Sequence, residues 1–451
     1  MPGRSSMLIG FVVVAVAVAF ADSSIVVLAL PELYGRFNTT IEGVSWVVTA
    51  YNASVAVVAL GLVFIVHRWQ AAYTLGGGLV IFIVASIACA SSGSLDFLIA
   101  ARCVQGAGAA LLLAGALPIL AALTGSAARG GAIWTLAGTF GAALGPALGG
   151  VVTQAFDWRA IFAVQAPLAA LGLVAAALAP SSSLLEEGWR PSLARTIPAN
   201  VCLGLVFGAL VGVLFLSVLL VITVWGYSPI AGAVIVSVLP AATLATRRLA
   251  PRLDSLFAVW SGAGLLALGL VALGFLPSAS VGRATAGLVL CGVGLGLAVP
   301  ILSDAALDLG VGLTRSGTLT IGVRHLGLVL ALAVIAPILA AQLPSAGHRV
   351  TLRATAVLLD APIGLATKVP VAVGVAAELR KARAGEVPDI SKPFDDHGAR
   401  EDSRVAAVRD DVVATIETTI TRSFRAAFLF SAVLAVAALL VAVALRGRLL
   451  R

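Results

Sequence analysis

An aspartate and an arginine stand inside long apolar runs of this 451-residue chain. Asp22 lies about eight residues, or ~12 Å at the rise of an α-helix, from the far end of the first run. Arg102 lies at a similar depth in the fourth run, so the two side chains can pair. A carboxylate beside an arginine in apolar surroundings can bind and release a proton, which makes the pair a functional candidate. A fixed structural ion pair is the alternative interpretation.

The elements that position these residues follow from composition. Hydrophobic residues make up 60% of the chain and charged residues 11%, and the mean hydropathy is +1.08, which excludes a water-soluble domain. A helix crosses a bilayer with ~20 apolar residues. Twelve runs of that kind occur, near 7–30, 44–66, 72–92, 96–123, 131–153, 158–180, 199–223, 229–246, 256–276, 282–303, 316–340 and 424–445. We therefore predict an all-α membrane protein.

The net charge of +8 indicates the orientation. Residues 344–422 hold 11 basic and 11 acidic residues, so the other 18 basic and 10 acidic residues carry the whole excess. With the N terminus in the cytoplasm, twelve arginines fall on the inner face and, outside 344–422, four on the outer face, as the positive-inside rule requires. We expect a multi-pass protein of the cell (inner) membrane with both termini cytoplasmic, and no nucleic-acid partner. The first run is expected to be a retained span and not a cleaved signal peptide.

The chain divides into two sets of six spans. The connection 181–198 is rich in serine and contains Pro191, as interdomain linkers are. We predict a six-helix bundle in 1–180, a cytoplasmic linker in 181–198, spans seven to eleven in 199–343, and the last span with a cytoplasmic tail in 423–451. Paired halves of this kind bind substrate between them and expose it to each side in turn.

The remaining segment, 344–422, has a different composition. Residues 371–383 and 403–421 mix apolar and charged side chains at helical spacing, and a stretch with two prolines separates them. We hypothesise a helical hairpin outside the membrane that restricts substrate entry or meets a partner in the cell envelope. A solvated loop is the alternative.

The fifth span carries a stripe of glycines. Gly141, Gly145 and Gly149 recur every four residues, with Pro146 and Gly150 beside them. Such a stripe permits close backbone contact with a neighbouring helix, and the proline favours a bend. Packing alone also explains the pattern.

Further polar residues are candidates for a cavity or an inner gate. Arg324 lies in the eleventh span and Asp304 near the inner end of the tenth, and their pairing would form a gate, although a structural role explains them equally well. Candidate cavity residues are Trp46, Tyr51, Asn52, Gln105 and Gln165. Aromatic residues at helix ends are also typical interface anchors.

Enzymatic chemistry is disfavoured. The four cysteines and four histidines are scattered, without the spacing of a metal site or a catalytic triad. The chain contains no GxxxxGK[ST] phosphate-binding loop. We therefore expect no cofactor, no metal and no enzyme activity.

Several motifs resemble those of one transporter family. They are Ala21–Pro31 in the first span, Trp46–Tyr51, Ala101–Ala110, Gly141–Gly150 and Asp157–Phe162. Together they resemble the drug:proton antiporters of the major facilitator superfamily, particularly the fourteen-helix multidrug exporters. The resemblance implies two six-helix bundles, proton coupling through Asp22 and Arg102, and a rocking motion supported by the glycines.

The chain departs from the family in two places. The loop after the second span keeps only Arg68 of the expected Gly-x-x-x-Asp-Arg-x-Gly pattern and has His67 where the family has aspartate. Asp254 occupies the corresponding acidic position of the second half. The connection 181–198 is too short for two further spans, so we expect twelve helices and not fourteen.

The leading hypothesis is a proton-coupled exporter of hydrophobic or amphipathic compounds. Its partners would be the lipid bilayer, protons and a small amphipathic substrate, and we expect a monomer. Two alternatives are an exporter of one lipid or secondary metabolite, and a transport-incompetent membrane scaffold or sensor that acts through 344–422.

Overall fold

The computed structural model describes residues 2–179, 193–307, 312–381, 387–400 and 402–444. Within these residues, twelve helices are long and apolar enough to cross a membrane, which confirms the predicted number. The expected linker 181–198 lies largely outside the described residues, and α8 already begins at Leu193. Described residues outside helices are short turns.

The first six long helices form the N-terminal bundle. These helices are α1 (Pro2–Ile25), α3 (Ile41–Leu62), α4 (Ala71–Ala90), α5 (Leu95–Thr124), α6 (Ala127–Ala155) and α7 (Trp158–Leu178). α1 packs against α5, α6 and α7, and α4 packs between α5 and α7. A 3₁₀ turn at Val26–Ala29 and the short helix α2 (Leu30–Arg36) continue α1, so the first helical segment runs further than the sequence predicts.

The other six form the C-terminal bundle. They are α8 (Leu193–Val218), α9 (Pro229–Thr246), α10 (Ser255–Gly274), α11 (Val281–Ala306), α12 (Leu313–Asp360) and α16 (Arg425–Ala444). α8 contacts α11, α12 and α16, and α10 packs against α11 and α16. A π-helical turn at Leu219–Val224 extends α8, and 3₁₀ turns occupy Val66–Arg68, Ala250–Arg252 and Arg422–Phe424.

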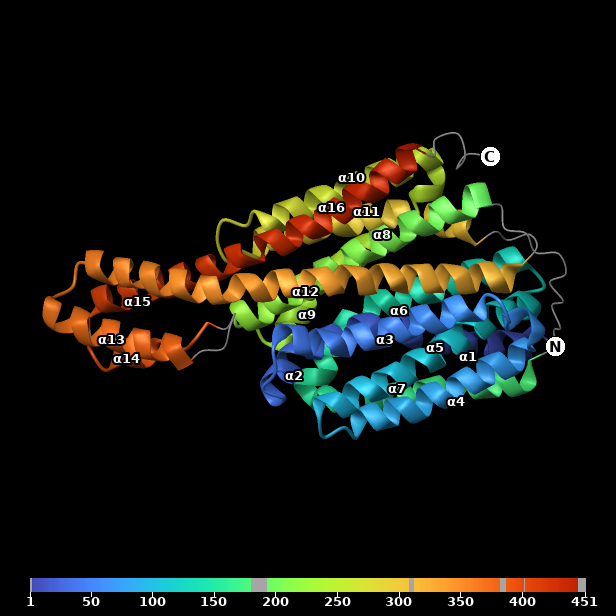
Figure 1. The fold of residues 1–451 in the computed structure, drawn as a ribbon, viewed down its shortest axis with the longest axis horizontal. Helices are drawn as coiled ribbons and strands as arrows, with labels where there is room; N and C mark the ends of the chain where they lie inside the picture. Colours follow the sequence, from blue (N-terminus) through green and yellow to red (C-terminus); the bar gives the residue numbers. More distant parts are fainter. Residues whose placement is uncertain (1, 180–192, 308–311, 382–386, 401, 445–451) are drawn as a thin grey trace.

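α12 does not end where its apolar run ends. The sequence predicts a span that stops near 340, yet the helix continues through Pro344 to Asp360 and projects beyond both bundles (Figure 1). It packs there against α15 (Ser403–Thr421), while α13 (Leu365–Lys381) and α14 (Ser391–Asp395) complete the projection. Buried residues on α12 recur every four positions: Ala346, Val350, Ala354 and Leu358. This stripe holds the helix together outside the apolar run, because it buries side chains against α15.

The molecule therefore has two distinct ends. At the termini end, α1 begins and α16 ends; at the hairpin end, α12 and α15 project (Figure 1). The two bundles meet along two lines, α6 against α9 and α12 against α3 and α5. The candidate site lies between them.

Candidate functional site

Asp22 on α1 and Arg102 on α5 form an ion pair inside the N-terminal bundle. Arg102 Nη1 donates to Asp22 Oδ2 over 2.5 Å, and neither side chain has any exposed surface. Arg102 Nε donates to the backbone oxygen of Val47 on α3 at 2.9 Å. The two charges thus pair, as their similar depth in the sequence predicts, and one guanidinium joins three helices.

Amide side chains extend this ion pair. Gln105 Oε1 accepts from Arg102 Nη1 at 2.6 Å, and Gln105 Nε2 donates to Gln165 Oε1 at 3.0 Å and to Ser86 Oγ at 2.9 Å. Gln105 Nε2 also lies 3.4 Å from Asp22 Oδ1. The network therefore links α1, α4, α5 and α7 to a single titratable carboxylate, so a change in its protonation alters contacts on four helices.

Two residues of α3 close the network on its other side. The ring of Tyr51 lies under Arg102, with its centroid 4.3 Å from Cζ, and its hydroxyl donates to the backbone oxygen of Ala19 at 2.8 Å. Asn52 Oδ1 accepts from Ser23 Oγ at 3.0 Å. Both residues were candidate cavity residues, as were the two glutamines, yet none of the four lies on the cavity wall described below. Their polar groups form hydrogen bonds within the network instead, while Arg102 Nη2 and Gln165 Nε2 have no partner in the described structure.

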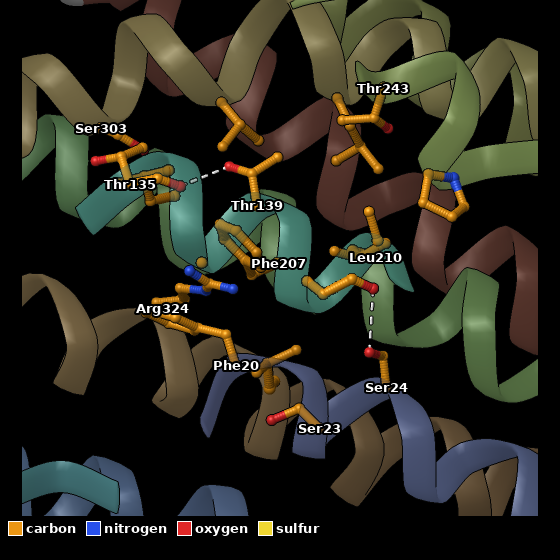
Figure 2. Close-up of a pocket in the computed structure, with 18 of the residues that line it drawn as sticks. Phe20, Ser23, Ser24, Thr135, Thr139, Phe207, Leu210, Thr243, Ser303 and Arg324 are labelled. Atoms are coloured by element: carbon orange, nitrogen blue, oxygen red, sulfur yellow. Dashed lines mark hydrogen bonds between the residues drawn. The ribbon is translucent and has the colours of Figure 1, made fainter. Parts of the chain in front are cut away.

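A cavity lies between the bundles (Figure 2). It adjoins this network at Ser23, which lines the cavity and donates to Asn52. The space free of protein atoms there is about 1130 Å³, which includes space open to the surroundings. Its wall comes from α1 and α6 on one side and from α8, α9, α11 and α12 on the other. Most wall residues are apolar, and hydroxyl groups are spread among them: Ser23, Ser24, Thr135, Thr139, Thr243, Ser303 and Thr320. Such a surface suits an amphipathic small molecule.

The cavity is placed toward the termini end. Its wall uses residues 134–143 of α6 and residues 295–303 of α11, which lie nearer that end than the hairpin end. At the hairpin end the bundles touch: a Cβ on Gly150 would lie 2.2 Å from Cβ of Ala233, and Gln154 Oε1 accepts from the backbone N–H of Ile230 at 3.0 Å.

Arg324 of α12 projects into the cavity (Figure 2). Its Cζ lies 4.4 Å from the ring centroid of Phe20 on α1 and 3.8 Å from that of Phe207 on α8. Within the described residues it forms no ion pair with Asp304, which is exposed near the end of α11. The structure therefore does not form the gate pair that the sequence suggested, since the two side chains point to different surroundings.

The glycine stripe of α6 lies directly against α1. A Cβ on Gly141 would approach the backbone oxygen of Ala17 to 2.1 Å, and one on Gly145 would approach Ser24 Oγ to 2.0 Å. Gly149 faces the backbone of Ile25 in the same way. α6 nevertheless continues as a helix through Pro146. The expected close backbone contact is present, and it brings the cavity wall of α6 next to the wall of α1.

The remaining sequence candidates lie away from the cavity. Trp46 is 54% exposed near the hairpin end of α3, as an interface anchor would be. Arg68 is exposed, and the side chain of His67 falls outside the described part of the structure. Asp254 caps α10, because its Oδ1 accepts from the backbone N–H of Phe257 at 2.9 Å.

Sequence reasoning missed most of the cavity wall. Phe207, Trp134 and Thr135 sit in apolar helices where nothing in their spacing separates a wall residue from a lipid-facing one. Only the packing of the two bundles makes that distinction. Phe20 had one usable signal, its position two residues before Asp22.

Solved structures with a similar fold are transporters. A bacterial homologue of the human lysosomal transporter Spinster, in an inward-facing and occupied conformation, aligns over 99% of this chain and 98% of its own with a TM-score of 0.65 and 15% identity. The D-xylose–proton symporter aligns over 74% of this chain and 90% of its own, with a TM-score of 0.60 and 14% identity. At these identities the likeness is one of fold.

Relatives with similar sequence are resistance and efflux proteins. The drug efflux pump JefA of Mycobacterium tuberculosis is 34% identical over 34% of this chain and 30% of its own. The methylenomycin A resistance protein of Bacillus subtilis is 33% identical over 35% of this chain and 34% of its own. The multidrug resistance protein Stp of Mycobacterium tuberculosis is 33% identical over 43% and 37%. The matched regions thus span about a third of these relatives.

A family-wide comparison covers far more of the chain. The sequence model of the Major Facilitator Superfamily matches residues 12–331, which include the ion pair, the glycine stripe and Arg324. With twelve spans in two bundles around a central cavity, the chain belongs to the Major Facilitator Superfamily, a class of membrane transport proteins and not of enzymes.

Proposed function

We propose that this chain is a proton-coupled exporter, an antiporter, that moves hydrophobic and amphipathic compounds such as drugs by alternating access. The observation that carries the proposal is the position of the cavity, which lies between the two bundles and directly beside a buried carboxylate–guanidinium pair. The names of the relatives, which are efflux and resistance proteins, support the same class of cargo.

The geometry supports a route from the cytoplasm. With both termini on the cytoplasmic side of the inner membrane, the termini end faces the cytoplasm. The projection formed by the outer part of α12 with α13, α14 and α15 then lies outside. The cavity lies toward the inner end, and Gly150 with Ala233 closes the outer one. This is the inward-facing state of the cycle, ready to take a substrate from the cytoplasm or the inner leaflet.

Asp22 would carry the proton. Protonation removes the negative charge that holds Arg102, while the next two residues, Ser23 and Ser24, stand on the cavity wall. Proton binding and substrate binding therefore act on the same turn of α1, and each favours one orientation of the bundles. The contacts of Gly141 with α1 and of Gly150 with α9 support a role for α6 as the helix along which the bundles rock.

Transport in proteoliposomes tests this function. A matched series of fluorescent amphipaths, pyrenebutyrate, pyrenebutanol and pyrenebutylammonium, serves as the probe set, with protein-free vesicles as the blank. We expect an imposed pH gradient to drive accumulation of at least one probe. Asp22→Asn should abolish the response to the gradient while retaining exchange of probe at equal pH, which shows that the variant folds. Asp96→Asn, an exposed carboxylate on the same helix as Arg102, is the matched control and should behave like the unmodified protein. Gradient-driven accumulation that survives in Asp22→Asn contradicts the proposal.

A further inference from the structure

The cavity wall carries a positive charge, and no acidic group in the described part of the chain pairs with it. Among the residues that line the described cavity, Arg324 is the only charged one. The nearest acidic group that the network provides, Asp22, is already committed to Arg102. Within the described residues Arg324 takes part in no ion pair, and its Nε has no hydrogen-bond partner. Arginine keeps its charge at neutral pH, so the charge is permanent.

Two aromatic rings hold this guanidinium in place. Phe20 and Phe207 lie 4.4 and 3.8 Å from Cζ, one from each bundle. Cation–π contacts contribute only about 0.5–2 kcal/mol each. Arg324 is half-buried, and these contacts do not supply the negative charge that a counter-ion would, so the rings position the guanidinium without replacing a counter-ion. They cover its faces and leave the N–H groups at its edge for an acceptor.

Further donors stand on the same wall. The hydroxyls of Thr135 on α6 and Thr320 on α12 are buried and have no hydrogen-bond partner in the described structure. Thr320 lies one helical turn before Arg324, on the same face of α12. Figure 2 shows Arg324 and Thr135 in the same region of the cavity, with Phe20 and Phe207 beside them. Unpartnered buried donors around a fixed guanidinium are the pattern that an oxyanion completes.

We propose that the cavity binds amphipathic compounds that carry an oxyanion, a carboxylate or a phosphate, and that Arg324 pairs with that group. The apolar body of such a compound would lie along the leucine and valine side chains that α8 contributes, Leu203, Leu210, Val211 and Leu214. Arg324 is then the residue that selects anionic over cationic cargo, since a cation in this cavity would face an unscreened like charge. Export of such compounds rests on the proposed function; their binding does not.

Equilibrium binding to the purified full-length protein in detergent tests the selectivity. The three pyrene probes share one apolar body and differ in charge, and their binding is followed by fluorescence anisotropy without any pH gradient. We expect the unmodified protein to bind pyrenebutyrate at least about 10-fold more tightly than pyrenebutylammonium, with pyrenebutanol between them, as one charge-assisted contact provides. Equal affinities, or a preference for the cation, overturn the proposal without any variant being made.

Variants then assign the preference to Arg324. Arg324→Gln should weaken the binding of pyrenebutyrate by about 10-fold or more and that of pyrenebutanol by less than about threefold. Arg324→Lys should retain part of the preference for the anionic probe. Arg425→Gln is the matched control, because Arg425 also covers an aromatic ring, that of Phe275 at 3.6 Å, but lies outside the cavity wall. Equal weakening of all three probes in Arg324→Gln overturns the role of Arg324.

Competition distinguishes the two oxyanions and separates this inference from the proposed function. Decanoate and decyl phosphate are compared as competitors of pyrenebutyrate, with decanol as the uncharged reference. Displacement by either anion beyond that by decanol supports the oxyanion site and identifies which group fits, and equal displacement by all three contradicts it. If the anion binds through Arg324 yet no probe responds to a pH gradient, the proton-coupled function fails and the binding site stands.

Discussion

Gly150 on α6 packs directly against Ala233 on α9, across the boundary between the two bundles. A Cβ on the glycine would lie only 2.2 Å from Cβ of the alanine. The same Cβ would lie 2.6 Å from the backbone oxygen of Pro229. One missing methyl group therefore permits the hairpin end to close over the cavity.

Gly150→Ala should open the hairpin end, because the added methyl group meets backbone that cannot yield. We expect the distance between spin labels at Phe156 and Tyr227, both exposed at that end, to increase in the variant. Pulsed electron spin resonance measures this distance, on a background in which the exposed Cys103 is replaced. Gly77→Ala, where a Cβ meets nothing within 4 Å, should leave the distance distribution unchanged. An unchanged distribution in Gly150→Ala contradicts the closure by this contact.

Asp22 and Arg102 should show strong coupling in a double-mutant cycle. Removing either partner leaves the other charge buried without its counter-ion, at a cost of about 3–5 kcal/mol. Asp22→Asn and Arg102→Gln should each lower the thermal unfolding temperature, and the double variant should unfold at a higher temperature than the sum of the two losses predicts. Additive losses would show that the pair is not energetically linked.

The contact between α1 and α6 should be intolerant of a single methyl group. Gly141→Ala places its Cβ 2.1 Å from the backbone oxygen of Ala17, so the helices must separate. We expect a large fall in unfolding temperature and in the yield of monodisperse protein. Gly61→Ala, also helical but open around its Cα, should be neutral or slightly stabilising, because alanine favours helix over glycine. Equal stability of both variants would remove the packing argument.

The stability of the projection at the hairpin end should depend on the buried apolar side chains between α12 and α15. Ile416 on α15 has no exposed surface, so Ile416→Ala should cost about 2–5 kcal/mol of local stability. We expect faster tryptic cleavage after Arg404 and Arg409, which lie on the same helix. Val373→Ala changes a side chain that is 63% exposed and should not alter the cleavage rate. Similar rates in both variants would mean that α15 is held by other contacts.

Sequence reasoning located the elements and the ion pair for a shared physical reason. Apolar runs of membrane length are stable in a bilayer as helices. Opposite charges within such runs, such as Asp22 and Arg102, are stabilised by forming an ion pair. The cavity followed no such rule, because Phe207 and Thr135 become wall residues only when two bundles are packed together. The suggested pairing of Arg324 with Asp304 failed for a related reason, since proximity in apolar sequence says nothing of the direction in which each side chain points.

α12 is longer than predicted because hydropathy indicates the length of the membrane-spanning part and not the length of the whole helix. Its apolar run ends near 340, whereas buried side chains such as Val350 and Leu358 continue at helical spacing against α15. A four-residue period in a segment with ordinary charge content is the sequence signal for this extension, whereas the predicted amphipathic helices begin only at 371.

α12 carries Arg324 in the cavity and also forms part of the projection, so a tilt of this helix at the cavity moves its far end outside the bundles. Arg324 and Asp360 are separated by roughly 54 Å of continuous helix at the α-helical rise. A tilt of about ten degrees about the cavity would displace the tip by roughly 9 Å over that length. α12 is one continuous helix between Arg324 and Asp360 and runs through Pro337 and Pro344, so occupancy of a site between the bundles can be reported at a surface far from it.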